Sequence, residues 1–464
     1  MKARSIFRMI LAGLLILAVL TACAPATPQV VEKVVEKPVV QTVVVTKEVP
    51  VEKKVVETVV VQEKRTQLSF AGHQYFNMSF GPAPAPLEYM RQVVAEKYPN
   101  IDIQLIMQPL DANKWHDNLT TYWMAKDPTV DLVYVVGYWI TEFAEAGWLM
   151  PLDDKIDPAL LAKYDPAYLD IFRHNGKLVA LGPAWGGIGG LYYRKDLLEK
   201  YGLKPPETYD DIIAACDTIR KDNPDLGCWD WPAMRNVVLV NRWSEFLHGF
   251  GGTYFNKDGT CAMNSPEAVK ALEFMTMLFK KGYTPQEALS WKEEDANVRF
   301  VSGQTIFFTG RQDLLFWIDD PAKSKIVGKW GFIPNPAQPG GRHAGFPEFW
   351  AFAVSAYSDN PDEALKVLEL WGSFPTMKNF NLAWGPIQGH SDVYTDPDVL
   401  KANPNLPLIE EIAKTAIPPL PSANYGEITD LLQAQIHSAL SGQISPKQAL
   451  DDACAAIDVI EKGP

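Results

Sequence analysis

The fold class of this chain follows from three segments: QLSFA (67–71), IDIQL (101–105) and DLVYVV (131–136). All three have the composition of β-strands; the second alternates apolar and polar residues, and the third is a mostly apolar run typical of a buried strand. Residues 86–98 and 115–125, which lie between them, have helical spacing. The order β-α-β-α-β is typical of a parallel sheet covered by helices, so we predict an α/β fold.

Four later segments have the amphipathic spacing of helices: 210–221, 265–281, 362–371 and 425–440. The second of them begins with Ser265, Pro266 and Glu267, a capping residue followed by proline in the first turn. About four hundred residues follow the N-terminal region, which is more than one hydrophobic core usually supports. We therefore expect two lobes.

The N-terminal end predicts export and a lipid anchor. It carries three cations, Lys2, Arg4 and Arg8. An apolar run at 9–20 follows, which is short for a permanent membrane span. LTAC at 20–23 then resembles the lipobox of bacterial lipoproteins, in which the cysteine is lipidated. We expect a signal peptide over 1–22 and a protein held by Cys23 at the outer face of the cytoplasmic membrane, on the cell surface or in the periplasm. An uncleaved anchor is the alternative.

Residues 23–65 form a low-complexity segment in which valine pairs alternate with charged pairs. Pro38 and Pro50 interrupt it. This composition favours an extended tether over a packed domain. A short coiled coil is the alternative, although the prolines and the β-branched residues disfavour it.

The charge balance excludes one class of partner. The formal net charge is −13, and it becomes −16 when the three cations leave with the signal peptide. Nucleic-acid binding needs clustered lysine and arginine, so we expect no nucleic-acid partner.

Cys216, Cys228, Cys261 and Cys454 remain once Cys23 is lipidated, an even number for an oxidising compartment. Three complete pairings are possible. We favour Cys228 with Cys261, because the two flank what looks like one helix and hairpin. Four unpaired buried thiols are the alternative.

Seven phrases together point to a family. They are YPNIDI (98–103), PTVDLVY (128–134) with FAEAGWLMPL (143–152), GKLVALGP (176–183) through LYYRKDLL (191–198), FVSGQTIFFTG (300–310) and NPDEAL (360–365). In this order they resemble the extracellular solute-binding proteins of ABC importers, in the group of the maltose and trehalose binders. The resemblance covers nearly all of the chain after the tether.

This resemblance implies a two-lobed, type II periplasmic-binding-protein fold with a hinge and a central cleft. By the same resemblance, the lobes are 66–181 plus 350–384, and 182–349 plus 385–464. Three Gly-Pro or Phe-Pro pairs lie near the expected crossings and combine permissive with rigid backbone: 182–183, 346–347 and 385–386. These pairs are candidate hinges.

The implied function is that of a monomeric receptor with no enzymatic activity, no cofactor and no metal. It would close on a small solute, most often a sugar in this group, and deliver the solute to the transmembrane subunits of an ABC permease.

Loops that follow the strands of an open α/β sheet are where ligands bind, and several here are aromatic. Flat rings suit the apolar faces of a sugar, and amides, carboxylates and guanidinium groups suit its hydroxyl rim. We predict Trp139, Trp185, Trp243 and Tyr425 as platforms, Asn241, Arg311, Gln312 and Glu348 as the rim, His73, Gln74 and Tyr138 as further lining, and Gly186 and Gly187 as points of close backbone approach. Core packing is the alternative for any tryptophan, and we assign Trp123, Trp148 and Trp371 to the core. For Arg311 and Glu348 the alternative is an ion pair that bridges the lobes.

Enzymatic alternatives have weaker support. None of the seven histidines has metal-site spacing, GGIGG at 186–190 does not match the dinucleotide motif, and no hydrolase elbow occurs. A lipid-anchored glycoside hydrolase could use neighbouring carboxylates, either Glu293, Glu294 and Asp295 or Asp319 and Asp320. A surface lipoprotein that binds carbohydrate without transport is the third hypothesis. The solute itself stays open, and Arg311 with the Tyr-Trp pair at 138–139 leaves room for an anion.

Overall fold

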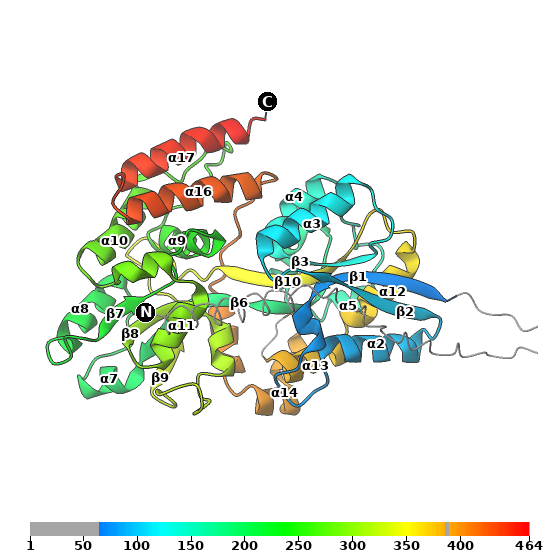
Figure 1. Cartoon of the computed structure of the whole chain (residues 1–464), viewed down its shortest axis with the longest axis horizontal. Coiled ribbons are helices and arrows are strands. Elements are labelled where there is room, and N and C mark those ends of the chain that lie inside the picture. The colour runs from blue at the N-terminus through cyan, green and yellow to red at the C-terminus, as the bar shows by residue number, and fades with distance from the viewer. Residues whose placement is uncertain (1–64, 386–388, 464) are drawn as a thin grey trace, which may run out of the picture. The chain divides into compact units, whose positions relative to one another are not determined.

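The computed structural model describes residues 65–385 and 389–463 (Figure 1). The predicted signal peptide, the lipidation at Cys23 and the tether up to residue 64 lie outside these residues, as does Pro386 of one candidate hinge. Within the described ranges, no helix combines the length and the apolar character needed to cross a membrane.

One mixed sheet runs through the body, with the strand order β2-β1-β3-β10-β6-β8-β7 and with β9 paired to β6. The strands are β1 (Thr66–His73), β2 (Ile101–Gln108), β3 (Leu132–Val136), β6 (Leu181–Arg194), β7 (Gly227–Asp230), β8 (Thr305–Arg311), β9 (Trp330–Ile333) and β10 (Pro347–Val354). β1 pairs in parallel with β2 and β3, so the predicted β-α-β-α-β start is confirmed. β4 (Arg173–His174) and β5 (Lys177–Leu178) form a separate hairpin.

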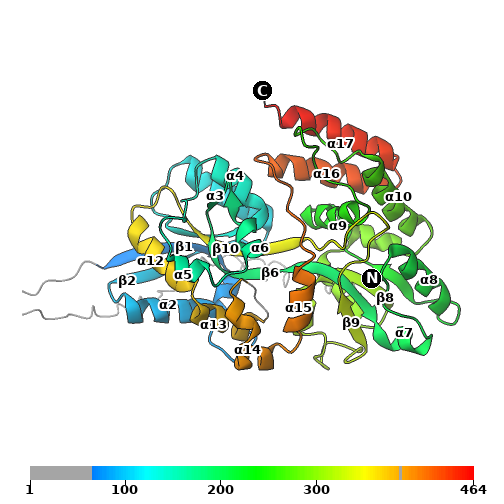
Figure 2. The same cartoon turned by 180° about the vertical axis from the view of Figure 1, so that it is seen from behind.

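The long strand β6 connects two lobes. Its first part pairs with β10 and its last part with β8 and β9 (Figures 1 and 2). The first lobe contains β1, β2, β3 and β10 with α2 (Pro86–Lys97), α3 (Ala112–Met124), α4 (Ile140–Glu145), α5 (Pro158–Leu161), α6 (Pro166–Ile171), α12 (Pro361–Trp371) and α13 (Phe374–Trp384). The residue limits given above for the lobes remain a prediction.

The second lobe contains β7, β8 and β9. Its helices are α7 (Lys195–Lys200), α8 (Tyr209–Ile219), α9 (Val237–Gly249), α10 (Pro266–Lys280), α11 (Glu293–Val301), α16 (Tyr425–Leu440) and α17 (Pro446–Ile460). α14 (Pro397–Ala402) and α15 (Leu406–Ala413) lie on the chain's return path between the lobes. The helices predicted at 210–221, 265–281, 362–371 and 425–440 are confirmed as α8, α10, α12 and α16.

Side-chain caps explain where several helices begin. The hydroxyl of Ser265 accepts a hydrogen bond from the backbone N–H of Ala268, 3.3 Å away, and Pro266 occupies the first turn of α10, as the sequence predicts. The amide oxygen of Asn236 accepts the N–H of Val238 at 3.0 Å and so sets the start of α9. That start matters because α9 is buried along most of its length.

The core of the first lobe is aromatic. Phe70, Phe76, Tyr134, Phe352 and Trp371 are all fully buried. Ring centroids lie 4.9 Å apart for Phe70 and Phe76 and 5.0 Å apart for Phe352 and Trp371. Trp371 and Trp123 are therefore core residues, as predicted, and Trp148 stacks on Trp123 at 5.4 Å.

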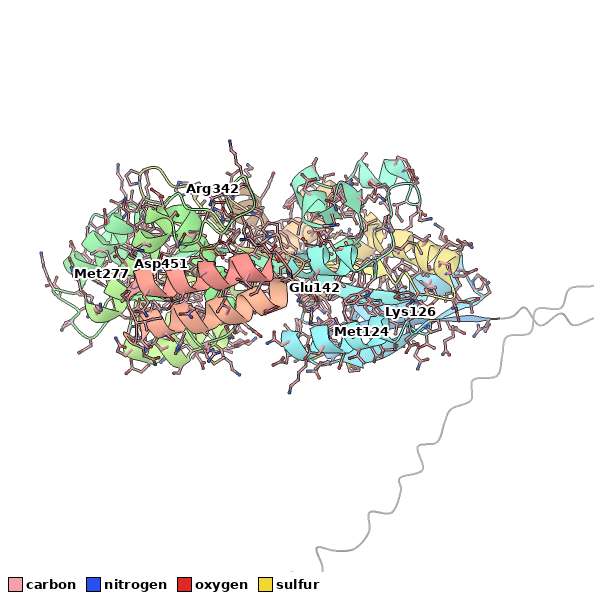
Figure 3. The ribbon with its side chains drawn as sticks, turned by 90° about the horizontal axis from the view of Figure 1, so that it is seen from above. Met124, Lys126, Glu142, Met277, Arg342 and Asp451 are labelled. Carbon is pink, nitrogen blue, oxygen red and sulfur yellow. A yellow bond between two sulfur atoms is a disulfide. The ribbon has the colours of Figure 1, made fainter. Side chains whose placement is uncertain are left out.

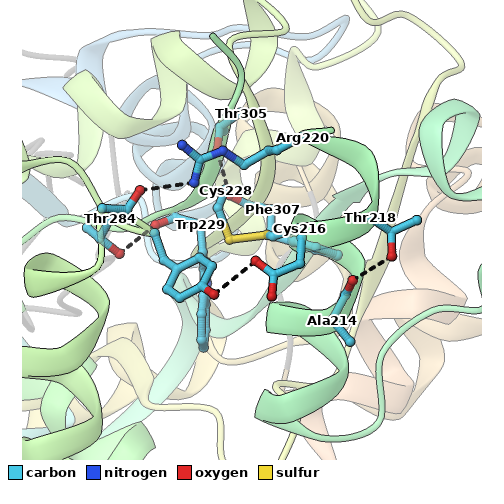
Figure 4. The surroundings of a disulfide bond; sticks show 12 residues. Ala214, Cys216, Thr218, Arg220, Cys228, Trp229, Thr284, Thr305 and Phe307 are labelled. Carbon is cyan, nitrogen blue, oxygen red and sulfur yellow. Dashed lines mark hydrogen bonds between the residues drawn. A yellow bond between two sulfur atoms is a disulfide. The ribbon is translucent and has the colours of Figure 1, made fainter. Parts of the chain in front are cut away.

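Two disulfides stabilise the second lobe, and the favoured pairing of Cys228 with Cys261 is wrong. Cys216 of α8 is bonded to Cys228 of β7 (Figure 4), and Cys261 is bonded to Cys454 of α17. The Cα atoms are 5.4 Å and 5.3 Å apart, within the range that a disulfide requires. The sequence could not identify this pairing because α17, which is last in the chain, packs beside the loop that carries Cys261. The backbone N–H of Cys261 donates to Asp458 of α17 at 2.8 Å.

Candidate ligand-binding site

Two cavities are lined by residues of both lobes. The larger has a volume of about 510 Å³ and is lined by Tyr75, Phe80, Gly81, Pro82, Asp313, Leu315, Trp317, Lys323, Asn381, Leu382, Ala383, Trp384, Gly385 and residues 402–405. The smaller, of about 280 Å³, is lined by Ala112, Asn113, His116, Asp117, Tyr138, Trp139, Val237, Tyr425, Gly426, Thr429 and Asp430. Both volumes are compatible with small solutes.

The larger cavity combines aromatic rings with hydrogen-bonding groups. Phe80 and Trp384 border it from the first lobe, and Trp317 with Asp313 borders it from the loop after β8. Phe80 is 67% exposed, so its ring is accessible to a solute. The indole N–H of Trp384 donates to the carbonyl of Met78 at 2.9 Å, which orients its ring. Flat rings beside carboxylate and amide groups are what a sugar or polyol needs from a protein.

The smaller cavity brings together three of the predicted residues, Tyr138, Trp139 and Tyr425. The rings of Tyr138 and Tyr425 come from different lobes and stack with centroids 5.0 Å apart at an angle of 17°. Nearby, Nε2 of His116 lies 3.0 Å from the carboxylate of Glu142, whose side chain is visible on the first lobe in Figure 3. Burial opposes the charge of His116, but Glu142 and Asp117 raise its pKa above the usual value.

Arg311 and Glu348 form an ion pair with an N–O distance of 2.8 Å, which is the alternative that the sequence left open for them. Arg311 also lies 3.5 Å from Asp313, and its backbone N–H donates to Glu293 at 3.1 Å. Although burial opposes its charge, Glu348, Asp313 and Glu293 raise the pKa of Arg311 further. The guanidinium is thus already neutralised by carboxylates, which disfavours the anionic solute that Arg311 suggested.

A second buried ion pair lies on α9. Nη1 of Arg242 is 3.0 Å from Glu245, and both side chains are 2% exposed. Burial raises the pKa of Glu245 to about 7, while the charge of Arg242 opposes that shift. Burial also raises the pKa of Glu293. Together with Arg311, Asp313 and Glu348, these residues form a group with more carboxylates than guanidinium groups, and Asp313 is the member that lines the larger cavity.

The remaining predicted residues line neither cavity. His73 ends β1 among aromatic rings, and burial lowers its pKa to about 4. Gln74 is exposed, and Gln312 is fully buried. Asn241 and Trp243 are buried on α9. Their predicted contact with solute remains a prediction.

Gly186 and Gly187, which we predict to allow close approach of the backbone to solute, lie in β6. Gly187 pairs with Glu348, and a Cβ atom at Gly187 would lie 3.1 Å from Cγ of Gln312, so a side chain there would crowd the loop after β8. Trp185 and Gly186 are described only through their strand pairing with Trp350 and Phe349. The platform role of Trp185 therefore concerns a side chain outside the described part of the structure.

Sequence reasoning missed the residues of the larger cavity. Asp313 follows directly after the predicted Arg311 and Gln312, and Trp317 lies four residues further along the same loop. Trp384 precedes the candidate hinge at 385–386, where Gly385 has a φ of +102°, a value that favours glycine. Phe80 lies seven residues after the end of β1, whereas strand patterns identify only the first residues of the loop.

Four of the carboxylates proposed for a hydrolase accept hydrogen bonds from other groups of the protein. Asp295 accepts the backbone N–H of Lys292 at 2.9 Å, at the start of α11. Asp319 accepts from the N–H of Gly328 and the indole of Trp330, and Asp320 accepts from the N–H of Ala322. Glu293 belongs to the buried ionic cluster, and none of these residues lines either interlobe cavity.

Comparison with known proteins gives consistent matches. The model of the bacterial extracellular solute-binding protein family matches residues 82–373. A probable ABC transporter-binding protein of Deinococcus radiodurans is 28% identical over 311 residues, covering 65% of this chain and 73% of the relative. The mannitol-binding protein of Pseudomonas aeruginosa is 23% identical over 390 residues, covering 78% and 87%. The structure of maltose-bound MalE3 from T. maritima superposes with a TM-score of 0.73 at 28% identity, covering 84% of this chain and 98% of that one.

Proposed function

Because this chain belongs to the bacterial extracellular solute-binding protein family, we propose that it captures a neutral sugar or polyol between its lobes. In this proposal the receptor then presents the solute to the transmembrane subunits of an ABC permease. It has no catalytic step, and the predicted lipid on Cys23 keeps it at the outer face of the cytoplasmic membrane.

The larger interlobe cavity carries this proposal. Phe80 and Trp317 offer rings from the two lobes, the largely buried Trp384 borders the same cavity, and Asp313 and Asn405 offer hydrogen-bonding groups there. A solute held there contacts both lobes at once, so its binding energy favours the closed arrangement over an open one. The relatives named for mannitol and for maltose support a polyhydroxylated solute.

Charge supports a neutral solute over an anion. Arg311 is paired with Glu348 and Asp313, so the cleft offers no uncommitted guanidinium at this point. Lys323, which also lines the larger cavity, is 59% exposed and lies 3.4 Å from Asp320. A phosphate would therefore have to compete with existing carboxylate partners.

A thermal-shift screen of the full chain tests the proposal. Maltose, mannitol, ribitol, glucose 6-phosphate, spermidine and an amino-acid mixture are the probes. A solute at one hundred times its Kd stabilises the native state by about 2.7 kcal/mol, so a neutral carbohydrate should raise the melting temperature measurably. A shift with the phosphate or the polyamine alone would contradict the proposed solute class.

Phe80→Ala sharpens the screen because this ring is exposed and contributes little to the core. Loss of one stacking face should weaken binding of the responding carbohydrate about tenfold, without a change in the melting temperature of the unliganded chain. Met124→Ala, which removes another exposed apolar side chain away from the cavities, is the matched control. Equal affinity for the two variants would exclude Phe80 from the site.

A further inference from the structure

Three segments that connect the lobes meet at Gly345 and Phe346. The backbone N–H of Gly345 donates to Thr415 at 3.0 Å, and the N–H of Ile417 donates back to Gly345 at 3.0 Å. The N–H of Gly189 in β6 donates to Phe346 at 3.2 Å. Strand β6, the loop that enters β10 and the segment between α15 and α16 are therefore joined at one point.

Glu245 of α9 binds directly to this point. Its Oε1 accepts the backbone N–H of Phe346 at 3.0 Å, and its side chain is 2% exposed. A Cβ atom at Gly189 would lie 1.8 Å from the same oxygen, so this carboxylate fits only because position 189 is glycine. A hydrogen bond to a charged acceptor in a buried site is among the stronger contacts that a protein makes.

The helix that carries Glu245 also borders the cleft. Val237, at the start of α9, lines the smaller cavity. Nη1 of Arg242, one turn before Glu245, lies 3.0 Å from Oε2, the other carboxylate oxygen, so the two side chains form an ion pair. Helix α9 is buried along most of its length, so it is held rigidly by its surroundings. A displacement of Glu245 on this helix therefore displaces the crossing segments that are bound to it.

We infer that Glu245 is a positioning residue for lobe closure, which fixes the crossing segments to α9 through the N–H of Phe346 and so sets the lobe arrangement that binds solute. This inference rests on the proposed function, since it concerns the closure of the same cleft. Glu245 does not line either cavity and so does not act by touching solute.

The Glu245→Ala and Glu245→Gln variants of the full chain separate positioning from a merely structural role. Glutamine keeps an oxygen that accepts the N–H of Phe346, whereas alanine keeps none. Ser244→Ala is the matched control, because Ser244 is equally buried on the same helix and its hydroxyl donates to Val240 of that helix.

Two readouts apply. Spin labels introduced as unnatural amino acids at Met124 and Val298, which are 77% and 56% exposed on different lobes, report the distance between the lobes. Hydrogen exchange reports the Phe346 amide. For Glu245→Ala, we expect a broader distance distribution extending to longer values and about tenfold faster exchange of that amide. The glutamine variant and the control should match the wild type in both readouts.

A Glu245→Ala protein with lowered melting temperature but wild-type distances and wild-type Phe346 exchange would overturn the inference. If this variant does not fold, Gly189→Ala provides the same test, because its methyl group displaces the carboxylate while the charge stays. Each measurement is made without solute and with maltose or mannitol as the probe. Failure of both probes to bind would count against the proposed function alone, because the unliganded distances and exchange rates still decide the role of Glu245.

Discussion

The two lobes differ in the chemistry of their interiors. The first lobe has a mostly neutral, aromatic core in which His73 packs against Phe76 and Trp115. The second lobe buries charges, among them Arg242, Glu245, Glu293 and Arg311. Sugar recognition needs ring faces and hydrogen-bonding edges, and the larger interlobe cavity takes rings from both lobes, Phe80 from the first and Trp317 from the second. A solute that needs both rings is bound well only when both lobes contact it.

The lobes also differ in the interactions that stabilise each of them. Residues 66–181 contain no cysteine, and the aromatic core stabilises that part of the chain. Both disulfides of the described residues belong to the second lobe.

Loss of the long-range disulfide should have the largest effect. Cys261 and Cys454 are 193 residues apart in sequence, so their bond restricts the unfolded chain strongly. The double variant Cys261→Ser, Cys454→Ser should lose about 5 kcal/mol of stability in urea unfolding, by the chain-entropy estimate. The bond between Cys216 and Cys228 spans only 12 residues and should be worth about 3 kcal/mol. The reverse order would contradict the account.

Truncation of the aromatic core should be nearly as costly in the first lobe. Phe76 is fully buried and its ring lies 5.0 Å from those of Tyr134 and Trp384. Phe76→Ala should lower the free energy of unfolding by about 4 kcal/mol, independently of salt. Phe80→Ala, four positions later and exposed, is the control and should change stability by less than about 0.5 kcal/mol. Similar losses for the two variants would argue against this core.

Removal of a charge from the second lobe should cost somewhat less. Arg311→Met leaves Glu348 without its ion-pair partner, removes the positive charge beside Glu293 and should destabilise the chain by about 3 kcal/mol. Arg173→Met is the control, because Arg173 forms a more exposed pair with Asp153 at 2.7 Å and should contribute less than about 1 kcal/mol. An Arg311 variant as stable as the control would show that the cluster does not depend on this cation.

His73 and Glu245, one in each lobe, should respond to acid with opposite signs. The pKa of His73 is lowered to about 4, so the unfolded chain binds its proton first and the stability that neutral His73 contributes is lost as pH falls below its unfolded value of about 6.5. The pKa of Glu245 is raised to about 7, so the folded chain holds its proton more tightly and stability is lost as pH rises towards 7.

Urea unfolding at pH 7 and pH 5 separates these contributions in variants. Relative to the wild type, His73→Asn should gain about 2 kcal/mol between pH 7 and pH 5, because it removes the acid-sensitive group. Glu245→Gln should change in the opposite direction over the same interval. Parallel pH profiles for the two variants would contradict the assigned protonation states.

The sequence predicted the first lobe well because its elements are local. Hydrophobic periodicity and capping residues identify strands β1, β2 and β3 and the helices between them. Both are patterns that span only a few positions of the sequence. The disulfide pairing was wrong because it depends on α17 packing beside the loop of Cys261, a contact between distant parts of the chain. Patterns within a window carry no information about such contacts.

The candidate site was predicted only in part for the same reason. The smaller cavity brings together Tyr138, Trp139 and Tyr425. Sequence patterns could locate these residues, because the first two follow strand β3 and the third begins a helix. Trp243 is also aromatic, but it lies buried on α9 and borders neither cavity. Phe80 and Trp384 line the larger cavity only because the loop after β1 packs against the end of α13, where the N–H of Phe80 donates to Ala383 at 2.7 Å.

We expect the two lobes to bind one neutral solute between them without converting it. Isothermal titration of the full chain with the carbohydrate that responds in the thermal-shift screen, followed by chromatography of the recovered solute, tests it most directly. We predict saturable binding of one molecule per chain, with the carbohydrate recovered intact. Hydrolysed carbohydrate, or the absence of saturable heat for every neutral sugar and polyol, would contradict the account.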